Sequence, residues 1–258
     1  MTIQEIEQKL KAAATEYPPD MIIGQLLDIP RIAYNIALSI PFTKPLPEAV
    51  ICDVGGGIGL FSLGCAAVGF GKVILVDDFG DHVNQEVGTS ILDLHRRHGV
   101  QVVSRDVVLH GLKDLALAFD VVTCFDSMEH WHRSPKPLFH ELMSLINPGG
   151  RFVLGVPNCV NLRKRLTVPM GRGKWSSMQD WYEPALFRGH VREPDVQDLW
   201  FIAHDLKLEQ ARVLGQNWLG RQSNNQIIRT LTRLADPLMR LRPSLCSNIY
   251  LVGDKSAC

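Results

Sequence analysis

Short apolar runs alternate with helical patterns from about residue 45 to residue 157. The runs are rich in β-branched residues and cover 49–54, 72–77, 100–104, 119–125 and 151–156. Apolar residues at helical spacing fill the stretches between them, at 58–69, 81–98 and 135–146. Strands that are apolar throughout are typical of burial on both faces, which a parallel sheet covered by helices provides. The alternation therefore predicts an α/β fold with a doubly wound, Rossmann-like sheet.

The first 45 residues carry a different pattern. Residues 2–14 predict an amphipathic helix, because Thr2 and Glu5 have the spacing of a capping box. Its apolar stripe is made of Ile3, Ile6, Leu10 and Ala14. A proline-rich stretch at 40–49 then interrupts the chain. We expect residues 1–45 to form a helical N-terminal cap and residues 46–258 to form the main domain.

Residues 158–200 break the alternation, since glycine, proline, tryptophan and arginine are dense there and periodicity is weak. The sequence NPGG (147–150) predicts a helix stop and turn before the last strand of the alternating part. A long irregular insert in an α/β domain is usually a lid or a substrate-facing segment. After the insert we expect a helix at 195–206, a strand at 207–214, a further helical region and a final strand at 247–255.

The helical region near the carboxyl end is strongly amphipathic. One stripe holds Ile227, Leu231, Leu234, Leu238 and Leu241, and the arginines opposite it are Arg229, Arg233 and Arg240. Asp236-Pro237 predicts a break into two helices. Packing on the domain is the ordinary use of such a stripe. A lid, or an interfacial surface for a lipid-linked acceptor, is the alternative.

Composition excludes several classes of function. Among the 258 residues, Lys+Arg and Asp+Glu are equal at 27 each, so there is no basic excess of the kind that nucleic-acid binding needs. The first ten residues lack the features of a signal peptide. No apolar run approaches the roughly 18 residues of a transmembrane helix, which leaves only peripheral membrane contact open. The six cysteines are scattered, and several lie in apolar runs. We expect a soluble, cytoplasmic protein.

The sequence ICDVGGGIG (51–59) carries the clearest candidate for ligand binding. Its glycines follow a predicted strand, where the backbone can approach a ligand. A dinucleotide fingerprint needs a third small residue to pack the helix on the strand, but counting from Gly55 or Gly57 that position is Leu60 or Ser62. The spacing found is Gly55-x-Gly57-x-Gly59, with Asp53 two residues earlier. It does not fit a dinucleotide site well.

This segment resembles motif I of the class I S-adenosylmethionine-dependent methyltransferases. Four further segments agree with that family in order: VILVDD after the second strand, SRDVV after the third, FDVVTCFDSMEHW around the fourth, and LINPGGRFVLGVPN at the fifth. The resemblance is strong over residues 45–160 and looser beyond them. It implies a seven-stranded sheet whose last strand is antiparallel, and S-adenosylmethionine as the cofactor.

The resemblance also implies which residues bind the cofactor. They are Asp53, Gly55, Gly56, Gly57, Gly59, Asp77, Asp78, Asp106, Val107 and Asp126. Asp77 takes the place of the acid that binds the ribose hydroxyls, and Asp78 can share that role. Asp106 takes the place of the acid that contacts the adenine amino group. The alternatives are a helix-capping Asp77 and an Asp106 that is an ordinary loop acid.

Candidate catalytic groups follow the fourth strand. Asp126, Glu129 and His130 have i, i+3, i+4 spacing, so a helical turn would bring them together. His130 has a pKa range suited to a general base near neutral pH. The same three residues resemble the metal-binding E-x-x-E-H segment of quinone-biosynthesis O-methyltransferases, which implies a divalent ion such as Mg²⁺ as a second interpretation. The third is that Glu129 and His130 only brace the following loop.

A second candidate segment is FRGHVREPDVQDLW (187–200). His190 is expected to face His130 across the pocket as a catalytic residue, and Arg192 to hold an acidic acceptor or the lid. An ion pair at the start of the next helix is an equal alternative for Arg192. The aromatics of the insert are candidates for the walls of an acceptor pocket: Trp175, Trp181 and Tyr182. The basic run 161–166 is expected to be a solvated loop face.

The expected activity is transfer of a methyl group to oxygen of a small molecule, such as a secondary metabolite or a lipid-linked saccharide. Methyl transfer to nitrogen or carbon is the first alternative, because an amine makes less demand on a base. A catalytically silent S-adenosylmethionine-binding scaffold and a dehydrogenase are the others. Nucleic acid is not expected as the acceptor, since no NPPY-like motif follows the fourth strand. The acceptor and the oligomeric state are left open.

Overall fold

The structure is a computed structural model that describes residues 1–79, 82–115, 117–172 and 176–257. Its described strands form one seven-stranded sheet in the order β3-β2-β1-β4-β5-β7-β6. The strands are β1 (Val50–Val54), β2 (Lys72–Asp77), β3 (Val100–Ser104), β4 (Phe119–Phe125), β5 (Ile146–Pro157), β6 (Glu209–Gln216) and β7 (Asn248–Asp254). Each corresponds to a run predicted from the sequence.

The strand directions agree with the predicted sheet. β1 pairs in parallel with β2 and with β4, and β2 pairs in parallel with β3. β7 runs against β5, because Asn158 donates its N–H to Ser247 O at 2.9 Å whereas Lys255 donates to Gly150 O at 2.8 Å. As the residue numbers rise along β5, those of their hydrogen-bond partners on β7 fall, which only an antiparallel pair of strands allows. The expectation of seven strands with the last one antiparallel is confirmed.

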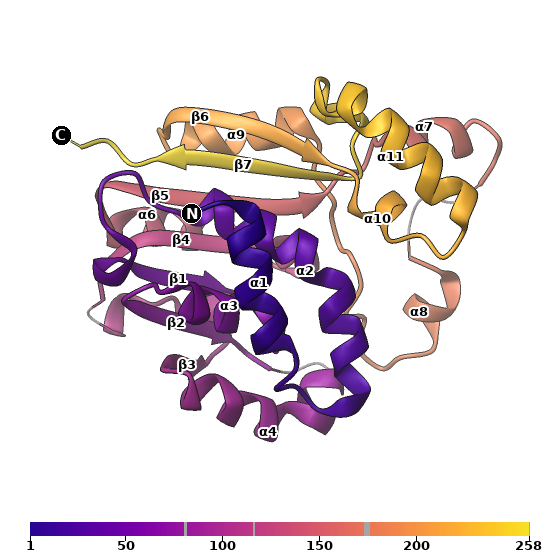
Figure 1. The fold of residues 1–258 in the computed structure, drawn as a ribbon. Helices are drawn as coiled ribbons and strands as arrows, with labels where there is room; N and C mark the ends of the chain where they lie inside the picture. Colours follow the sequence, from indigo (N-terminus) through magenta and orange to yellow (C-terminus); the bar gives the residue numbers. More distant parts are fainter. Residues whose placement is uncertain (80–81, 116, 173–175, 258) are drawn as a thin grey trace. The chain divides into compact units, whose positions relative to one another are not determined.

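The chain divides into two compact units. Unit 1 contains Met1–Phe125, Pro135–Val153 and Asp254–Cys258, and unit 2 contains Asp126–Ser134 and Leu154–Gly253. Unit 1 therefore holds β1 to β4 and the first part of β5, which lie side by side in Figure 1. Unit 2 holds the end of β5, β6 and most of β7. The division at residue 45 and the lid at 158–200 stay predictions.

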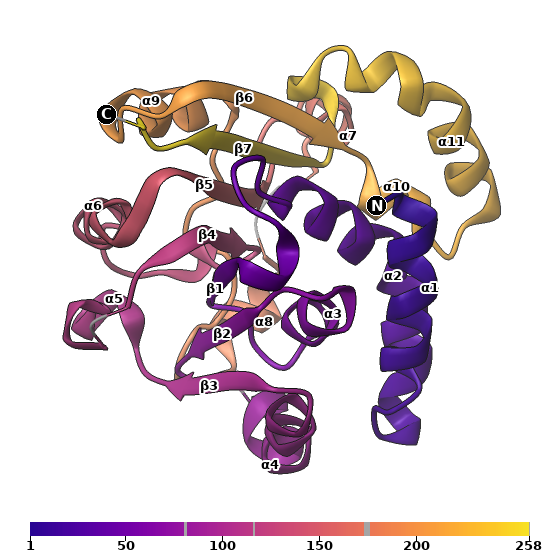
Figure 2. The same ribbon diagram turned by 60° about the vertical axis from the view of Figure 1, so that its left-hand side comes forward.

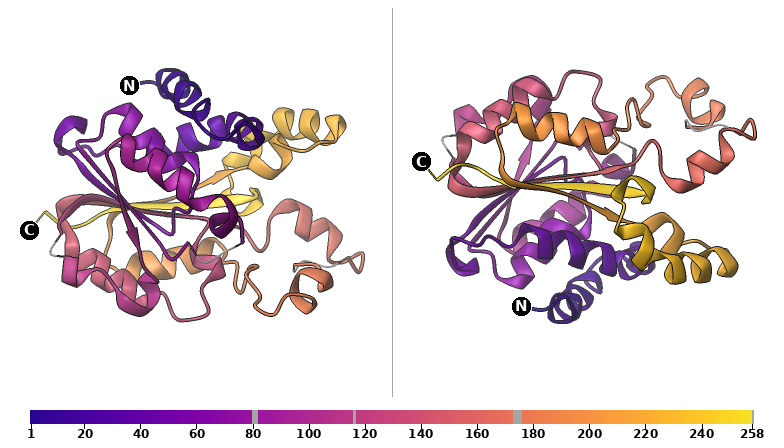
Figure 3. Two further views of the ribbon diagram at one scale, coloured as in Figure 1. Left: turned by 90° about the horizontal axis from the view of Figure 1, so that it is seen from below. Right: turned by 90° about the horizontal axis from the view of Figure 1, so that it is seen from above.

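Helices cover both faces of the sheet in unit 1. Figure 2 and the left-hand view of Figure 3 show α1 (Ile3–Ala14), α2 (Pro19–Ser39), α3 (Leu60–Val68) and α4 (His82–Arg97) on one face, and α5 (Val107–His110) and α6 (Lys136–Leu145) on the other. Short 3₁₀ turns lie at Leu46–Glu48 and Lys113–Leu115. The sheet is thus doubly wound, and β1, β2, β4 and β5 are largely buried as their apolar runs predicted, whereas the edge strand β3 is partly exposed.

The N-terminal helix follows its sequence signals closely. Thr2 and Glu5 form the predicted capping box, with Thr2 N–H donating to Glu5 Oε2 at 2.7 Å. Leu10 is buried, and a Cβ at Gly64 of α3 would collide with its side chain. Glycine at position 64 therefore lets α1 approach α3 closely, so the N-terminal helices belong to the core of unit 1. Ile3, the first residue of the predicted stripe, is 45% exposed.

The helix stop predicted before NPGG is confirmed, because α6 ends at Leu145, but the predicted turn at NPGG and the predicted break at Pro237 are wrong. The sequence NPGG lies inside β5, which begins at Ile146. Gly149 adopts φ +72° and still donates its N–H to Lys255 O, so the chain bends there without leaving the sheet. Pro237 lies inside a single continuous helix, α11 (Gln226–Arg240). Proline removes one backbone hydrogen bond, and the helix nevertheless continues to Arg240.

Unit 2 is built around β6 and β7. Its helices are α7 (Leu162–Thr167), α8 (Met178–Tyr182), α9 (Val196–Asp205), α10 (Trp218–Arg221) and α11, with 3₁₀ turns at Met128–His130 and Pro243–Leu245. α9 and α11 both contact β6. The described part of 158–200 has little regular structure apart from α7, α8 and the first residues of α9, as predicted. Trp175 lies outside the described residues, and Trp181 and Tyr182 are exposed.

The cysteines behave as the apolar runs predicted. Cys52, Cys65, Cys124 and Cys246 are buried, and no disulfide occurs among the described residues. Across the described ranges, no helix is both long enough and apolar enough to cross a membrane.

Candidate active site

The Gly-rich turn after β1 has a backbone that only glycine adopts easily. Gly55 and Gly57 have φ of +70° and +57°, in the left-handed region. Gly55 donates its N–H to Val76 O at 2.7 Å, which ties the turn to β2. A Cβ at Gly56 would overlap Asp53 Oδ2 and lie 2.6 Å from Leu75 Cδ1. The turn therefore packs tightly on the strands beneath it.

The other side of the turn is open. A Cβ at Gly57 would meet no heavy atom within 4 Å, and at Gly59 the nearest would be Gly56 O at 3.9 Å. The protein itself therefore does not require a small residue at Gly59, where φ is −74°. Space over these two glycines is what close approach of a ligand to the backbone would need. Gly59 is also the N-cap residue of α3, and the first N–H groups of a helix have no partner within the helix, so a polar ligand atom can accept from them.

Asp53 is buried beneath the turn. Ser62 Oγ donates to its Oδ2 at 2.7 Å, and Thr123 Oγ1 donates to its Oδ1 at 3.1 Å. Burial raises the pKa of the Asp53 carboxyl to about 7, with the charge of Asp77 acting in the same direction and the two hydroxyls opposing it. Asp53 thus connects β1 with α3 and β4, and it positions the turn.

Asp77, the last residue of β2, also holds the turn. Its Oδ2 accepts the Gly57 N–H and its Oδ1 accepts the Phe79 N–H, both at 2.9 Å. Burial raises the pKa of this carboxyl, and the two backbone hydrogen bonds oppose that rise. Each carboxylate oxygen has a second lone pair, so Asp77 retains acceptor capacity for vicinal hydroxyls. Its hydrogen bonds place it against the Gly-rich turn.

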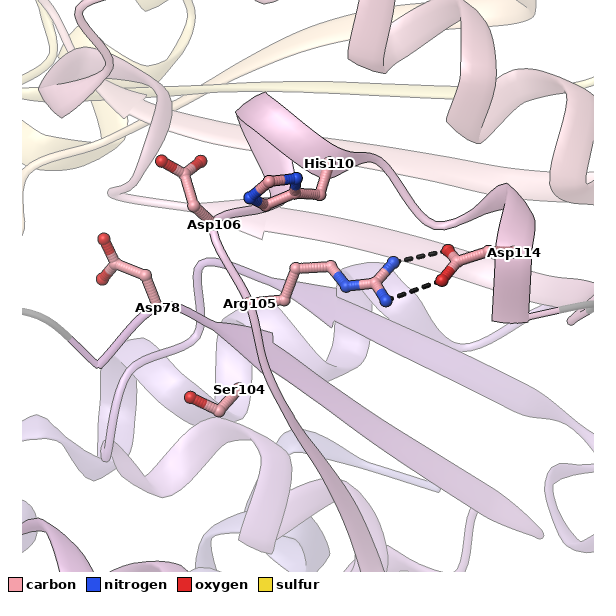
Figure 4. A pocket seen from close by; sticks show the side chains of 6 residues that line it. All are labelled: Asp78, Ser104, Arg105, Asp106, His110 and Asp114. Carbon is pink, nitrogen blue, oxygen red and sulfur yellow. Dashed lines mark hydrogen bonds and ion pairs between the residues drawn. The ribbon is translucent and has the colours of Figure 1, made fainter.

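A hollow of about 580 Å³ lies beside these residues in unit 1. It is lined by Asp78, Ser104, Arg105, Asp106, His110 and Asp114. Figure 4 shows the carboxylates of Asp78 and Asp106 on the same side of the hollow, while Arg105 turns away to pair with Asp114 at 2.5 and 2.7 Å. The structure therefore brings together two of the acids that the resemblance implied. Both follow the carboxyl ends of neighbouring strands.

Asp106 also caps α5. Its Oδ1 accepts the N–H groups of Val108 and Leu109, each at 3.0 Å. Because both bonds use Oδ1, Oδ2 is the oxygen that a ligand amino group would reach. Val107, beside it, is buried. Asp106 therefore has a structural role through Oδ1, and its role in cofactor binding stays a prediction.

Two residues that sequence reasoning missed contact the Gly-rich turn. Tyr17 donates its hydroxyl to Ile58 O at 3.1 Å, and His95 Nε2 lies 3.2 Å from Gly59 O. Burial lowers the pKa of His95. Tyr17 comes from the connection between α1 and α2, and His95 comes from the last turn of α4. No local pattern marks either residue, because their contacts are made across 41 and 36 residues of sequence.

In unit 2, three candidate catalytic groups meet. One ligand-type atom from each of Glu129, His130 and His190 lies within 4.8 Å of the others. The two imidazole rings are 4.8 Å apart at their centroids and nearly perpendicular. Glu129 O accepts the Val191 N–H at 2.7 Å, which joins the two segments. The structure thus places His190 against His130, as expected.

Asp126 does not belong to this group. Only Met128–His130 forms a helical turn, and Asp126 has φ +48°, outside the helical region. Its N–H donates to Gly155 O at 2.8 Å. The predicted helical turn through Asp126, Glu129 and His130 is therefore wrong, because the chain leaves β4 in a left-handed conformation before the turn begins.

Both histidines are oriented through Nδ1. His130 Nδ1 lies 2.7 Å from Arg188 O, and His190 Nδ1 lies 2.8 Å from Glu193 Oε1. An imidazole that donates from Nδ1 presents Nε2 as its acceptor. Burial lowers the pKa of His130, and the neighbouring His190 adds to this effect, although the backbone carbonyl of Arg188 opposes it. A neutral His130 with its lone pair on Nε2 is the form that a general base requires.

A buried ion pair supports His190. Lys164 and Glu193 form a salt bridge, and their side chains are only 9% and 14% exposed. Burial favours a raised pKa for Glu193, but hydrogen bonds from His190 and Lys164 outweigh it and lower the pKa. Glu193 is therefore a carboxylate that accepts from His190. The expectation that 161–166 is a solvated face is wrong at Lys164, whereas Arg163 and Arg165 are exposed.

Glu193 and Lys164 were missed as functional residues for different reasons. Glu193 follows His190 by three residues, a spacing that could have indicated the pair. Lys164 lies 29 residues from Glu193, and nothing local indicates that contact. Arg192 is 76% exposed in its side chain and pairs with Asp198 at 3.2 Å, which agrees with the ion-pair alternative.

Comparison with known protein families shows to which family this chain belongs. The profile of a family described as "methyltransferase domain" matches residues 31–235, well over half of the chain. The chain belongs to this methyltransferase family. It is a class I S-adenosylmethionine-dependent methyltransferase, as the segments around residues 45–160 predicted. A comparison with curated proteins finds no significant match.

Solved structures of methyltransferases share the fold. A methyltransferase from Thermotoga maritima, described as a possible histamine N-methyltransferase, is 15% identical with a TM-score of 0.53, over 97% of this chain and 100% of that one. Magnesium protoporphyrin IX methyltransferase from Synechocystis is 18% identical with a TM-score of 0.51, over 92% and 85%. Phosphoethanolamine N-methyltransferase 2 from Haemonchus contortus is 14% identical with a TM-score of 0.52, over 83% and 50%. At these levels of sequence identity, the likeness to the three solved structures shows a shared fold.

Proposed function

We propose that this methyltransferase transfers a methyl group to a hydroxyl oxygen of a small molecule and that His130 removes the proton. The observation that carries the proposal is the state of His130. Its Nδ1 is held by Arg188 O, and its pKa is lowered, so Nε2 offers a lone pair near neutral pH. A hydroxyl acceptor needs such a group, because its proton must leave as the new bond forms.

The cofactor residues of the proposal fit the observed geometry. S-adenosylmethionine, when bound, supplies an electrophilic methyl group on a sulfonium. The open side of Gly57 and Gly59 admits a ligand to the backbone. We assign the ribose hydroxyls to Asp77 and Asp78. The adenine amino group is assigned to Asp106 Oδ2, with Val107 beside it.

Three residues form the proposed acid–base group. His130 takes the proton on Nε2, and His190 lies against it, oriented by Glu193. Glu129 is buried beside both rings and favours the positive charge that His130 gains. Asp126 remains a proposed cofactor residue and is not part of this group. The acceptor we propose is a secondary metabolite or a lipid-linked saccharide.

A metal ion is the rival role for the same cluster. Mg²⁺ prefers oxygen ligands and keeps several waters, so a set with two imidazoles does not fit the ion expected from the sequence. The set Glu129, His130 and His190 fits Zn²⁺ or another transition metal better, since such ions take imidazole together with carboxylate, and each Nδ1 already has a hydrogen-bond partner that orients its ring. Coordination through Nε2 would prevent His130 from acting as a base. Elemental analysis of the purified protein distinguishes the two roles.

The test is transfer of labelled methyl groups to a panel of hydroxyl and amine acceptors. With a hydroxyl acceptor, His130→Ala is expected to lower kcat by about 10²–10⁴-fold. The exposed neighbour His132 supplies the matched control, and His132→Ala should retain activity. Because the pKa of His130 is lowered, kcat/KM should rise with pH through a limb below 6.5 and then level off. The His130→Ala variant should lack that limb.

Glu193→Gln tests the positioning of His190. A merely structural role would lower the amount of folded protein and leave the pH limb unchanged. We expect the limb to shift to a different pH instead, because loss of the carboxylate changes the charge that His190 and His130 experience.

Two outcomes would favour another function. If the His130→Ala variant methylates an amine acceptor as fast as the wild type does, O-methylation is contradicted and an N-methyltransferase is favoured. Binding of S-adenosylhomocysteine with no turnover of any acceptor would favour a silent scaffold.

A further inference from the structure

Tyr17 connects the N-terminal helices of unit 1 to the Gly-rich turn. It lies between α1 and α2 and is 3% exposed, and its hydroxyl donates to Ile58 O at 3.1 Å. Burial raises the pKa of this hydroxyl, so it stays protonated and keeps its proton for that bond. The Tyr17 ring meets the edge of the His95 ring, with centroids 6.4 Å apart and planes nearly perpendicular. Figure 2 shows α1 and α2 beside α3, which the turn precedes.

A second contact fixes the segment that carries Tyr17. Glu16 Oε2 and His98 Nε2 lie 2.8 Å apart, which joins the connection between α1 and α2 to the end of α4. From the same end of α4, His95 Nε2 lies 3.2 Å from Gly59 O. Two segments far from the turn in sequence therefore reach two consecutive carbonyl groups of the turn.

Holding a carbonyl oxygen also orients the N–H group that follows it. In a trans peptide unit the C=O and the N–H point in opposite directions. Because Ile58 O is directed at Tyr17, the Gly59 N–H points away from Tyr17. In the same way, Gly59 O lies toward His95, so the Leu60 N–H points away from His95. Both N–H groups are thus turned away from the core of unit 1.

These two N–H groups differ from the others of the turn. The N–H groups of Gly55 and Gly57 are bonded to acceptors on β2. Within the described ranges, those of Gly59 and Leu60 have no hydrogen-bond acceptor. A Cβ at Gly57 would meet nothing within 4 Å, so there is room over the turn for a ligand. The turn therefore offers two oriented donors to a ligand that carries an acceptor.

The order of the strands indicates which part of the cofactor comes here. β3, β2 and β1 are neighbours in the sheet. The proposed function places the adenine at Asp106, after β3, and the ribose at Asp77, after β2. Continuing in that direction, the methionine part of S-adenosylmethionine lies over the turn that follows β1. This part carries a carboxylate, which accepts hydrogen bonds and is favoured at the N-terminus of a helix.

We propose that Tyr17 is a positioning residue for the cofactor. By holding Ile58 O, it keeps the Gly59 N–H directed at the carboxylate of the methionine part. The inference rests on the proposed cofactor residues and adds to them a residue that acts through the backbone without touching the cofactor. It gives the N-terminal helices a function in cofactor binding, because their connection supplies the hydroxyl.

The test is calorimetric titration of the full chain with two nucleosides. S-adenosylhomocysteine carries the carboxylate, whereas 5′-methylthioadenosine has the same adenosine and sulfur but no amino acid part. Tyr17→Phe removes only the hydroxyl. We expect the Kd of this variant for S-adenosylhomocysteine to rise about three- to tenfold, the effect of one hydrogen bond, and its Kd for 5′-methylthioadenosine to change less than about twofold.

Tyr250 in unit 2 supplies the matched control. It is also 3% exposed, and its hydroxyl accepts from Trp218 Nε1 at 2.7 Å. Tyr250→Phe should bind both nucleosides like the wild type. Equal loss of affinity for both nucleosides in Tyr17→Phe would show a merely structural role and overturn the proposal, as would unchanged affinity for S-adenosylhomocysteine. A wild type that binds neither nucleoside would overturn the proposed cofactor residues and this inference with them.

Discussion

Single buried side chains determine the electrostatics of both candidate sites. Two hydroxyls donate hydrogen bonds to the buried Asp53 carboxyl. Burial makes its charged form costly, so its pKa rises to about 7. Glu193 is less deeply buried and accepts hydrogen bonds from His190 and Lys164, and its pKa falls. Two carboxylates on one chain therefore hold opposite preferences for a proton. The difference comes from the partners, since burial acts in the same direction on both.

Asp53 gives the protein a predictable pH dependence of stability. Its pKa in the folded state lies above the unfolded value, so the folded state binds the proton more tightly. The stabilisation this provides is complete below the unfolded pKa and is lost as pH rises through about 7. In the absence of cofactor, the difference in unfolding free energy between wild type and Asp53→Asn should fall with pH by at most about 1.4 kcal/mol per unit.

Denaturant titrations at several pH values measure that difference. The fall should occur between about pH 4 and 7 and should stop above that range. Ser62→Ala serves as a control, because it retains the ionisable group and should keep the pH dependence while changing its midpoint. A difference that stays constant across the whole range would contradict the raised pKa.

At the scale of elements, the buried face of a helix is decided by its specific partners. α1 buries Ile6, Leu10 and Ala14 of the stripe that its periodicity indicated, and Leu10 fits against Gly64 of α3. α11 does the reverse and leaves its leucine stripe exposed, because Asp236 finds Asn217 and Arg221 in the body of unit 2. An amphipathic pattern determines that a helix has two faces. The partners available determine which face is buried.

Asp236→Ala tests the anchor of α11. Asp236 is buried, whereas the Arg221 side chain is 32% exposed, so removing the carboxylate leaves Asn217 and Arg221 without this partner and we expect the protein to lose about 2 kcal/mol of stability. Amide exchange should accelerate in α11 while α1 stays protected. Asp93, which pairs with Arg96 on an exposed face where both side chains are 53% exposed, supplies the control. Asp93→Ala should cost less than about 0.5 kcal/mol, and similar losses in the two variants would count against a specific anchor.

At the scale of the molecule, most of the proposed cofactor residues belong to unit 1, and the acid–base group belongs to unit 2. Cofactor binding is therefore expected to stabilise the segments of unit 1 that carry the Gly-rich turn and the acids after β2 and β3. S-adenosylhomocysteine at about a hundred times its Kd should add roughly 2.7 kcal/mol to the free energy of unfolding. NAD should add none.

Hydrogen exchange locates that effect. Protection by S-adenosylhomocysteine should appear at 54–60, 76–79 and 104–109, and the variant Gly56→Ala should lose it, because its Cβ would overlap Asp53. Gly24, where a Cβ would meet nothing within 4 Å, is the matched control, and Gly24→Ala should retain protection. Stabilisation by NAD in place of S-adenosylhomocysteine would contradict the assignment of the cofactor.

The sequence by itself determined the strands, the parallel order, the Gly-rich turn and the family, because local periodicity and short motifs express these features directly. It also indicated His130 and His190 as a pair. Only the tertiary structure decided that Asp126 lies outside the helical turn of Glu129 and His130, that Lys164 supports Glu193, and that Tyr17 and His95 contact the Gly-rich turn. These contacts join residues far apart along the chain, and the orientation of α11 depends on one buried acid and the partners it finds. Such outcomes depend on which atoms meet, which no local pattern contains.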